Sequence, residues 1–200
     1  PIGKVILAFG GVIAAFAAAL KLLEPLDRPT ATGVLESAAA GLIVVLLNIL
    51  LTRKLIPEIN TDGLQTYWGA TVNAMPWSIL MLVQLYRVRL GGPMKRVRQG
   101  IALVSGFVAG GGLLLAAGPY NPVVASNATE TQGLIEGPMV FDSLALAYAM
   151  PGALLLVAGW KIPGLKQAIR LGFMSFGSGL LALYLALEIR RFWQGNWLGR

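Results

Sequence analysis

The fold class is decided by one short stretch, Leu42-Ile43-Val44-Val45-Leu46-Leu47. A transmembrane β-strand alternates apolar and polar residues over about ten positions, and this run does not alternate. It lies within an apolar block at residues 35–52. Crossing a hydrocarbon layer of roughly 30 Å takes about 20 helical residues, so the block is close to the length of a membrane-spanning helix. We therefore predict an all-α integral membrane protein.

Comparable apolar blocks recur along the whole chain. The six blocks are residues 5–23, 35–52, 68–86, 100–117, 141–160 and 171–189. Turn-forming prolines and glycines separate them, as at Glu24-Pro25 and Pro163-Gly164. We predict about six transmembrane helices. An alternative for the first block is a signal peptide, but Lys4 alone is a poor basic leader, so we expect residues 1–200 to be one transmembrane segment of a longer chain.

The composition supports this prediction and limits the chemistry. The chain is 56% hydrophobic and 12% charged, whereas about a quarter of the residues of a soluble domain are charged. It has no Cys and no His, so we expect no disulfide, no metal site and no cofactor. The net charge of +7 comes from basic residues at the ends of apolar blocks, a pattern that orients helices in membranes. We expect membrane lipids and other transmembrane helices, of the same longer chain or of a complex, as partners, and no nucleic acid.

Basic residues concentrate in alternate connections between the blocks. Two connections are basic: one holds Arg87, Arg89, Lys95, Arg96 and Arg98, and the other holds Lys161, Lys166 and Arg170. Residues 118–140 hold no Lys or Arg but include Glu130 and Glu136. Because positive charge stays on the cytoplasmic side, we predict that both basic connections are cytoplasmic in a bacterial inner membrane. The basic residues that run against this assignment are Arg53, Lys54, Arg190 and Arg191.

The chain also shows signs of an internal duplication. Ala74-Met75-Pro76 recurs as Ala149-Met150-Pro151, and each copy is followed by four large apolar residues after a short gap. We predict a direct repeat of helix pairs at about residues 62–117 and 136–190. Because each unit has two spans, both copies point the same way through the membrane, unlike the inverted repeats of many carriers.

Two stretches in the second half have a distinctive residue order. One runs from Glu136-Gly137-Pro138 through Asp142 into residues 146–151, and the other is residues 183–192. The chain resembles, in these stretches, the bacterial membrane proteins grouped as domain of unknown function 2339. Members are very long chains with many spans, so the resemblance implies further helices before and after these 200 residues. It supplies no reaction and no functional residue.

Polar groups within the apolar blocks are candidates for function, because burying charge in hydrocarbon is costly. We single out Glu36, Glu188 and Asn73. Glu36 is expected in the first turn of its helix, where it can reach headgroups. Glu188 stands three residues before Arg191, so we favour an ion pair between them over a role in a proton relay. For Asn73 we favour a hydrogen bond to a neighbouring helix.

Pro76 and Pro151 fall at matching positions of the proposed repeat. A proline inside a helix removes a hydrogen bond and frees a carbonyl, and broken helices line binding sites in transporters. Most such prolines only shape helix contacts. Small residues at four-residue spacing, as in Gly106–Gly110 and Ser175–Gly179, predict close helix packing.

Three functions compete at this stage. Short loops, small-residue faces and the lack of clustered catalytic groups favour an envelope scaffold or assembly subunit. The repeat and the paired prolines favour a transporter or channel for a small solute or lipid. A membrane enzyme would need acids or histidines grouped near the interface, and the sequence offers no catalytic residue of that kind outside the loop with Glu130 and Glu136, so we favour the first two functions over an enzyme.

Overall fold

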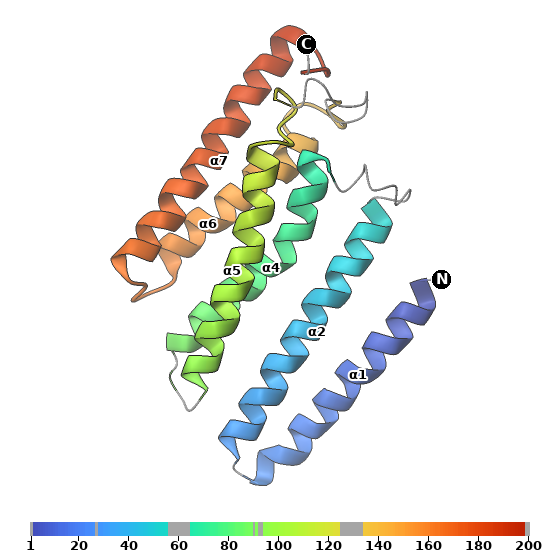
Figure 1. Cartoon of the computed structure of the whole chain (residues 1–200), viewed down its shortest axis with the longest axis vertical. Coiled ribbons are helices and arrows are strands. Elements are labelled where there is room, and N and C mark those ends of the chain that lie inside the picture. Colours follow the sequence, from blue (N-terminus) through green and yellow to red (C-terminus); the bar gives the residue numbers. More distant parts are fainter. Residues whose placement is uncertain are drawn as a thin grey trace. The chain divides into compact units, whose positions relative to one another are not determined.

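The computed structural model describes residues 2–26, 28–55, 65–89, 91, 94–124 and 134–198. These residues are almost entirely helical, and the all-α prediction is confirmed. Two of the described residues, Leu134 and Trp197, form an isolated antiparallel bridge. The elements in Figure 1 are α1 (Ile2–Leu23), η1 (Glu24–Leu26), α2 (Pro29–Leu55), α4 (Tyr67–Arg89), α5 (Lys95–Ala117), the π-helical turn η2 (Ala145–Ala149), α6 (Met150–Lys161) and α7 (Gln167–Gln194).

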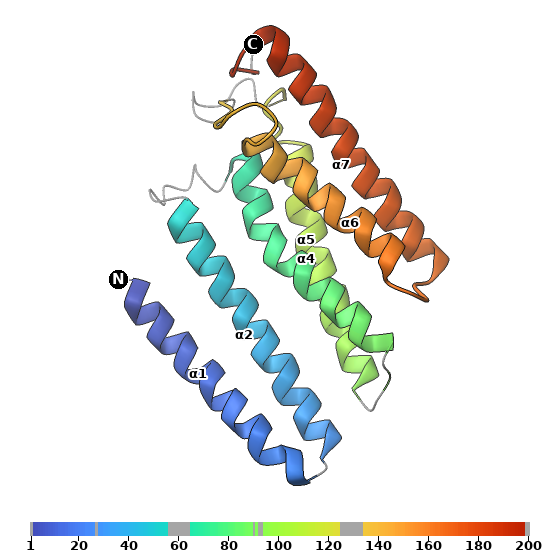
Figure 2. The same cartoon turned by 180° about the vertical axis from the view of Figure 1, so that it is seen from behind.

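The helices belong to two compact units, which we call unit 1 and unit 2. Unit 1 consists of residues 1–55 and 76–109, and therefore contains α1, α2, the second part of α4 and the first part of α5. α1 and α2 form a hairpin through η1 and lie side by side in Figures 1 and 2. Pro29 is the first residue of α2, a position that proline favours because its missing N–H would be unbonded there anyway.

Unit 2 consists of residues 56–75 and 110–200, and its core is the hairpin of α6 and α7 (Figure 2). Gly152 of α6 faces Gly177 of α7, and a Cβ placed on Gly177 would lie 2.8 Å from the Gly152 carbonyl oxygen. Backbones approach this closely only where both residues lack a side chain. The two glycines therefore set the distance between these helices.

Within the described residues, four helices are long and apolar enough to cross a membrane. They are Gly3–Leu23, Pro29–Arg53, Lys95–Ala117 and Gln167–Gln194, which correspond to the first, second, fourth and sixth predicted blocks. The fifth block is a shorter apolar helix, Ala145–Lys161. α4, the third block, is long enough with 23 residues, but polar residues such as Asn73, Ser78 and Gln84 interrupt it. For these two blocks, spanning remains a prediction.

Some sequence features lie outside the described residues. They include the start of the first proposed repeat, residues 62–64, and the acidic residue Glu130. The repeat itself remains a prediction. One local difference between its copies is visible, because Pro76 lies within the α-helix α4 whereas Pro151 is the second residue of α6, which begins where the π-helical turn η2 ends.

Candidate functional site

Glu36 belongs to a cluster of charged side chains in unit 1. Arg87 Nη1 donates a hydrogen bond of 2.9 Å to Glu36 Oε2, and Arg98 Nη2 lies 3.6 Å from the same oxygen. The predicted position of Glu36 in the first turn was wrong. α2 begins at Pro29, ahead of the apolar block, so Glu36 lies about two turns into the helix. Two cations share one carboxylate, and the cluster keeps a net positive charge.

Two polar side chains in this part of unit 1 hold buried atoms without a hydrogen-bond partner. They are the Nε of Arg98 and both amide atoms of Gln84, which lies one turn before Arg87 on α4 and is fully buried. A buried polar group without a partner costs roughly 1–3 kcal/mol. Unpartnered buried groups of this kind need an explanation. One explanation is a ligand that supplies the missing hydrogen-bond partner.

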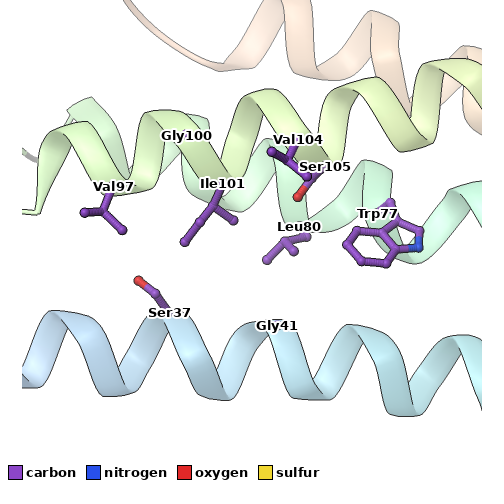
Figure 3. A pocket seen from close by; sticks show the side chains of 9 residues that line it. All are labelled: Ser37, Gly41, Trp77, Leu80, Val97, Gly100, Ile101, Val104 and Ser105. Atoms are coloured by element: carbon purple, nitrogen blue, oxygen red, sulfur yellow. The ribbon is translucent and has the colours of Figure 1, made fainter.

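A groove of about 440 Å³ lies beside this cluster, between α2, α4 and α5 (Figure 3). Its lining is mostly apolar, and the Ser37 hydroxyl that faces it already donates to the Gly33 carbonyl over 2.8 Å. The lining residues are Ser37, Gly41, Trp77, Leu80, Val97, Gly100, Ile101, Val104 and Ser105. Ser37 and Val97 are the chain neighbours of Glu36 and Arg98, so the charged cluster borders one end of the groove.

A second charged cluster lies in unit 2 and is centred on Arg191, which is only 3% exposed. Its Nη1 lies 2.5 Å from Asp142 Oδ2 and 3.8 Å from Glu188 Oε1. The predicted Glu188–Arg191 ion pair is therefore present, but Asp142 is the nearer partner. Arg191 also donates to the Gly137 carbonyl and to Asn196 Oδ1, so it joins α7 to two loops.

The loop that Arg191 holds has an unusual backbone. Gly137 has a φ of 109° and Val140 has a φ of 75°. Positive φ is rare for a β-branched residue and is maintained only by its surroundings. Here the Tyr184 hydroxyl donates to the Val140 carbonyl over 3.0 Å. The two stretches that carry the family resemblance, residues 136–142 and 183–192, therefore contact each other.

Tyrosines connect the same loop to neighbouring helices of unit 2. The Tyr67 ring stacks on Tyr148 with centroids 6.0 Å apart. The Tyr67 hydroxyl contacts Ser143 Oγ and donates to the Leu134 carbonyl, and the Tyr148 hydroxyl donates to the Ala116 carbonyl over 2.7 Å. Both tyrosines are fully buried, so their hydroxyls need these partners.

Pro151 frees a backbone carbonyl, and unit 2 supplies a donor for it. The carbonyl four residues earlier belongs to Ala147, and the Thr71 hydroxyl lies 3.1 Å from it in donor geometry. The same hydroxyl lies 3.2 Å from the Tyr67 carbonyl, so its single proton can serve one of the two at a time. A broken helix must find new hydrogen-bond partners for the backbone groups that the proline frees. Here the π-helical turn and the hydroxyl of Thr71 supply them.

The remaining two candidates are less informative. Pro76 is buried within α4. Asn73 Nδ2 donates to the Gly69 carbonyl, one turn earlier on its own helix, over 3.1 Å. The five candidates divide between the units: Glu36 and Pro76 belong to unit 1, and Asn73, Pro151 and Glu188 to unit 2.

Sequence reasoning missed the partners that come from distant parts of the chain. Asp142 is 49 positions before Arg191, and Arg87 is 51 positions after Glu36. One local signal was available for Asp142. It is the second residue of the fifth apolar block, near a helix start where Asp commonly acts as a cap, and its Oδ1 accepts a hydrogen bond from the Ala145 N–H.

Comparisons with known proteins identify a family but no characterised relative. A search of curated proteins found no match, and neither did a search of solved structures. The model of a protein family described as "Predicted membrane protein (DUF2339)" matches residues 2–200, which is nearly the whole chain. The match confirms the resemblance seen in residues 136–142 and 183–192, and the chain belongs to this family of membrane proteins of unknown function.

Proposed function

We propose that the chain is a scaffold or assembly subunit of a bacterial inner membrane, and that α7 binds another transmembrane helix of the assembly. The observation that carries this proposal is an exposed stripe of small residues along α7. The stripe consists of five residues that follow one another at alternating spacings of three and four positions: Gly172, Ser175, Gly179, Ala182 and Ala186. A Cβ placed on Gly172 or Gly179 would meet nothing within 4 Å.

The opposite face of α7 is already used within unit 2. Gly177, Leu180, Leu187 and Arg191 are buried there against the rest of the unit. At 100° per residue, the stripe lies on the far side of the helix from these residues. Small residues let two backbones approach closely, which is the main source of helix association in lipid. The hydrogen bonds of Arg191 fix one end of α7 to the rest of unit 2, so the face that carries the stripe is held in place.

A transporter or channel is the second candidate, and the broken helix at Pro151 favours it. The Ala147 carbonyl freed by that break has a donor in Thr71, however, and the groove in unit 1 is apolar. Both features are more typical of a protein that binds helices and lipid than of a protein that transports a polar solute.

The absence of cysteine from the chain allows a direct test. A cysteine at Ala186 would lie in the stripe, whereas one at the neighbouring exposed Leu185 would point about 100° away at the same depth. Each cysteine is labelled with a photoactivatable maleimide in native membranes.

We expect a protein crosslink from position 186 and mainly lipid adducts from position 185. A Gly179→Leu change should remove the crosslink from position 186. Equal crosslinking from the two positions, or lipid adducts from both, would contradict the proposal. Solute flux through the purified chain in liposomes would instead favour the transporter.

A further inference from the structure

We propose that the groove of unit 1 binds one anionic phospholipid, with an acyl chain between α2, α4 and α5 and the phosphate at Arg87 and Arg98. This site is separate from the α7 stripe and does not depend on it. Nothing in the family description assigns a ligand.

Charge is the first argument. Glu36 neutralises one of the two arginines, and the second positive charge is left for an anion. Two further basic residues flank the same turn between α4 and α5, and both are exposed: Arg89 and Lys95. Basic pockets between transmembrane helices on the cytoplasmic side suit anionic headgroups, and this turn is one of the two connections predicted to be cytoplasmic. Arginine suits phosphate in particular, because its planar fork can donate two parallel hydrogen bonds.

The shape of the groove is the second argument. Its lining on α5 runs from Val97 to Ser105, which is about 12 Å at 1.5 Å per residue. One leaflet is half of a hydrocarbon layer of roughly 30 Å, which is about 15 Å. The length of the groove, measured from the charged cluster, is therefore close to the thickness of one leaflet. Its volume of about 440 Å³ is within the range of small-molecule sites. Figure 3 shows Leu80 and Trp77 of α4 and Ile101 of α5 facing α2 across the groove.

The unpartnered donors are the third argument. Arg98 Nε is buried without an acceptor, and the buried amide of Gln84 also lacks partners. Gln84 lies one turn beyond Leu80 on α4, but it is fully buried and does not line the groove. A phospholipid carries phosphate and ester oxygens next to its acyl chains. Its headgroup therefore supplies acceptors for the partly exposed guanidinium groups of Arg87 and Arg98, and its tail suits the apolar lining.

The test measures lipid binding to the purified chain by native mass spectrometry. The probes are phosphatidylglycerol and phosphatidylcholine with the same acyl chains, and glycerol phosphate without acyl chains. The wild-type chain should retain phosphatidylglycerol over the other two. Arg98→Gln should weaken that binding about tenfold, because it removes charge-assisted hydrogen bonds. Arg96→Gln is the matched control, since it removes the same charge two residues away, and it should change binding less than about twofold.

Two further variants separate a binding role from a structural one. Glu36→Gln removes the carboxylate that competes for the arginines, so it should strengthen phosphatidylglycerol binding. Gly41→Leu should block the groove, since Gly41 lines it and a Cβ there meets nothing within 4 Å. Gly11→Leu adds the same side chain at an open position on α1 and should have no effect.

Several results would overturn the proposal. If Glu36→Gln weakened binding as much as Arg98→Gln, the ion pair would only hold the helices together. If Arg96→Gln and Arg98→Gln had equal effects, the attraction would come from diffuse charge. Binding of glycerol phosphate as tight as that of phosphatidylglycerol would indicate a free-anion site, and equal retention of both lipids would indicate unselective contact.

Discussion

All three guanidinium nitrogens of Arg191 bond to different parts of unit 2. Nη1 bonds Asp142, Nη2 bonds the Gly137 carbonyl and Nε bonds Asn196. A lysine has one nitrogen in place of this planar fork and cannot reach all three acceptors. The geometry therefore requires arginine and not simply a positive charge.

A substitution at this residue should show that requirement. Arg191→Lys should lower the free energy of unfolding by roughly 1–3 kcal/mol, because lysine keeps the charge beside Asp142 but leaves the Gly137 carbonyl and Asn196 without their donors. Arg190→Lys is the control, because the bond from Arg190 Nε to Gln194 Oε1 is exposed, and it should cost less than about 1 kcal/mol. The stability of both variants can be measured by following intrinsic tryptophan fluorescence while the protein is heated in detergent. Equal melting temperatures for the two variants would contradict the role given to Arg191.

Sequence reasoning at the residue scale succeeded where partners are close in sequence. The Glu188–Arg191 pair follows from a spacing of three on one helix, and it is present. Asp142 and the two arginines beside Glu36 could not be found in this way. Their pairing depends on which helices become neighbours, and hydrophobic blocks alone do not specify that.

Helix existence is the part of the fold that the sequence predicted best. Every apolar block coincides with a helix, because a continuous apolar run leaves the backbone no partners in lipid except its own. Helix starts were less predictable. α2 begins six residues before its apolar block, since Pro29 and the polar residues after it are also helical. The π-helical turn before Pro151 had no signal beyond the proline itself.

The hairpin of α6 and α7 gives a prediction at the scale of elements. Gly177→Ala should destabilise unit 2 by about 1–3 kcal/mol, because the new Cβ would overlap the Gly152 carbonyl and force the helices apart. Gly172→Ala on the same helix meets open space and should be neutral or stabilising by up to about 1 kcal/mol.

The melting temperatures of these two variants, measured in one detergent, test the close contact. If Gly177→Ala is as stable as Gly172→Ala, the two helices do not approach through these glycines. Circular dichroism before heating serves as the check that both variants are helical.

The charges of the chain predict its orientation in the membrane, and single cysteines can test that prediction. A cysteine in place of Arg96 should react with an impermeant maleimide only after the cytoplasmic side is opened. A cysteine in place of Glu136 should react from outside, because an acidic connection without Lys or Arg is not retained in the cytoplasm. Both positions are exposed. Reaction of both from the same side would refute the predicted topology.

The bonds of Arg191 also bear on how the protein is made. Asp142 precedes α6 and Arg191 stands near the end of α7, so the ribosome delivers the acid well before the base. An unpaired arginine at the centre of a helix costs roughly 2.5–3.5 kcal/mol during insertion, and less near an end. In the predicted orientation Asp142 lies outside the membrane, so it must already have crossed the bilayer when α7 arrives if the arginine is to be neutralised at once. Translocation of the segment before α6 thus becomes a precondition for stable insertion of α7, and the two helices should enter the membrane as a pair.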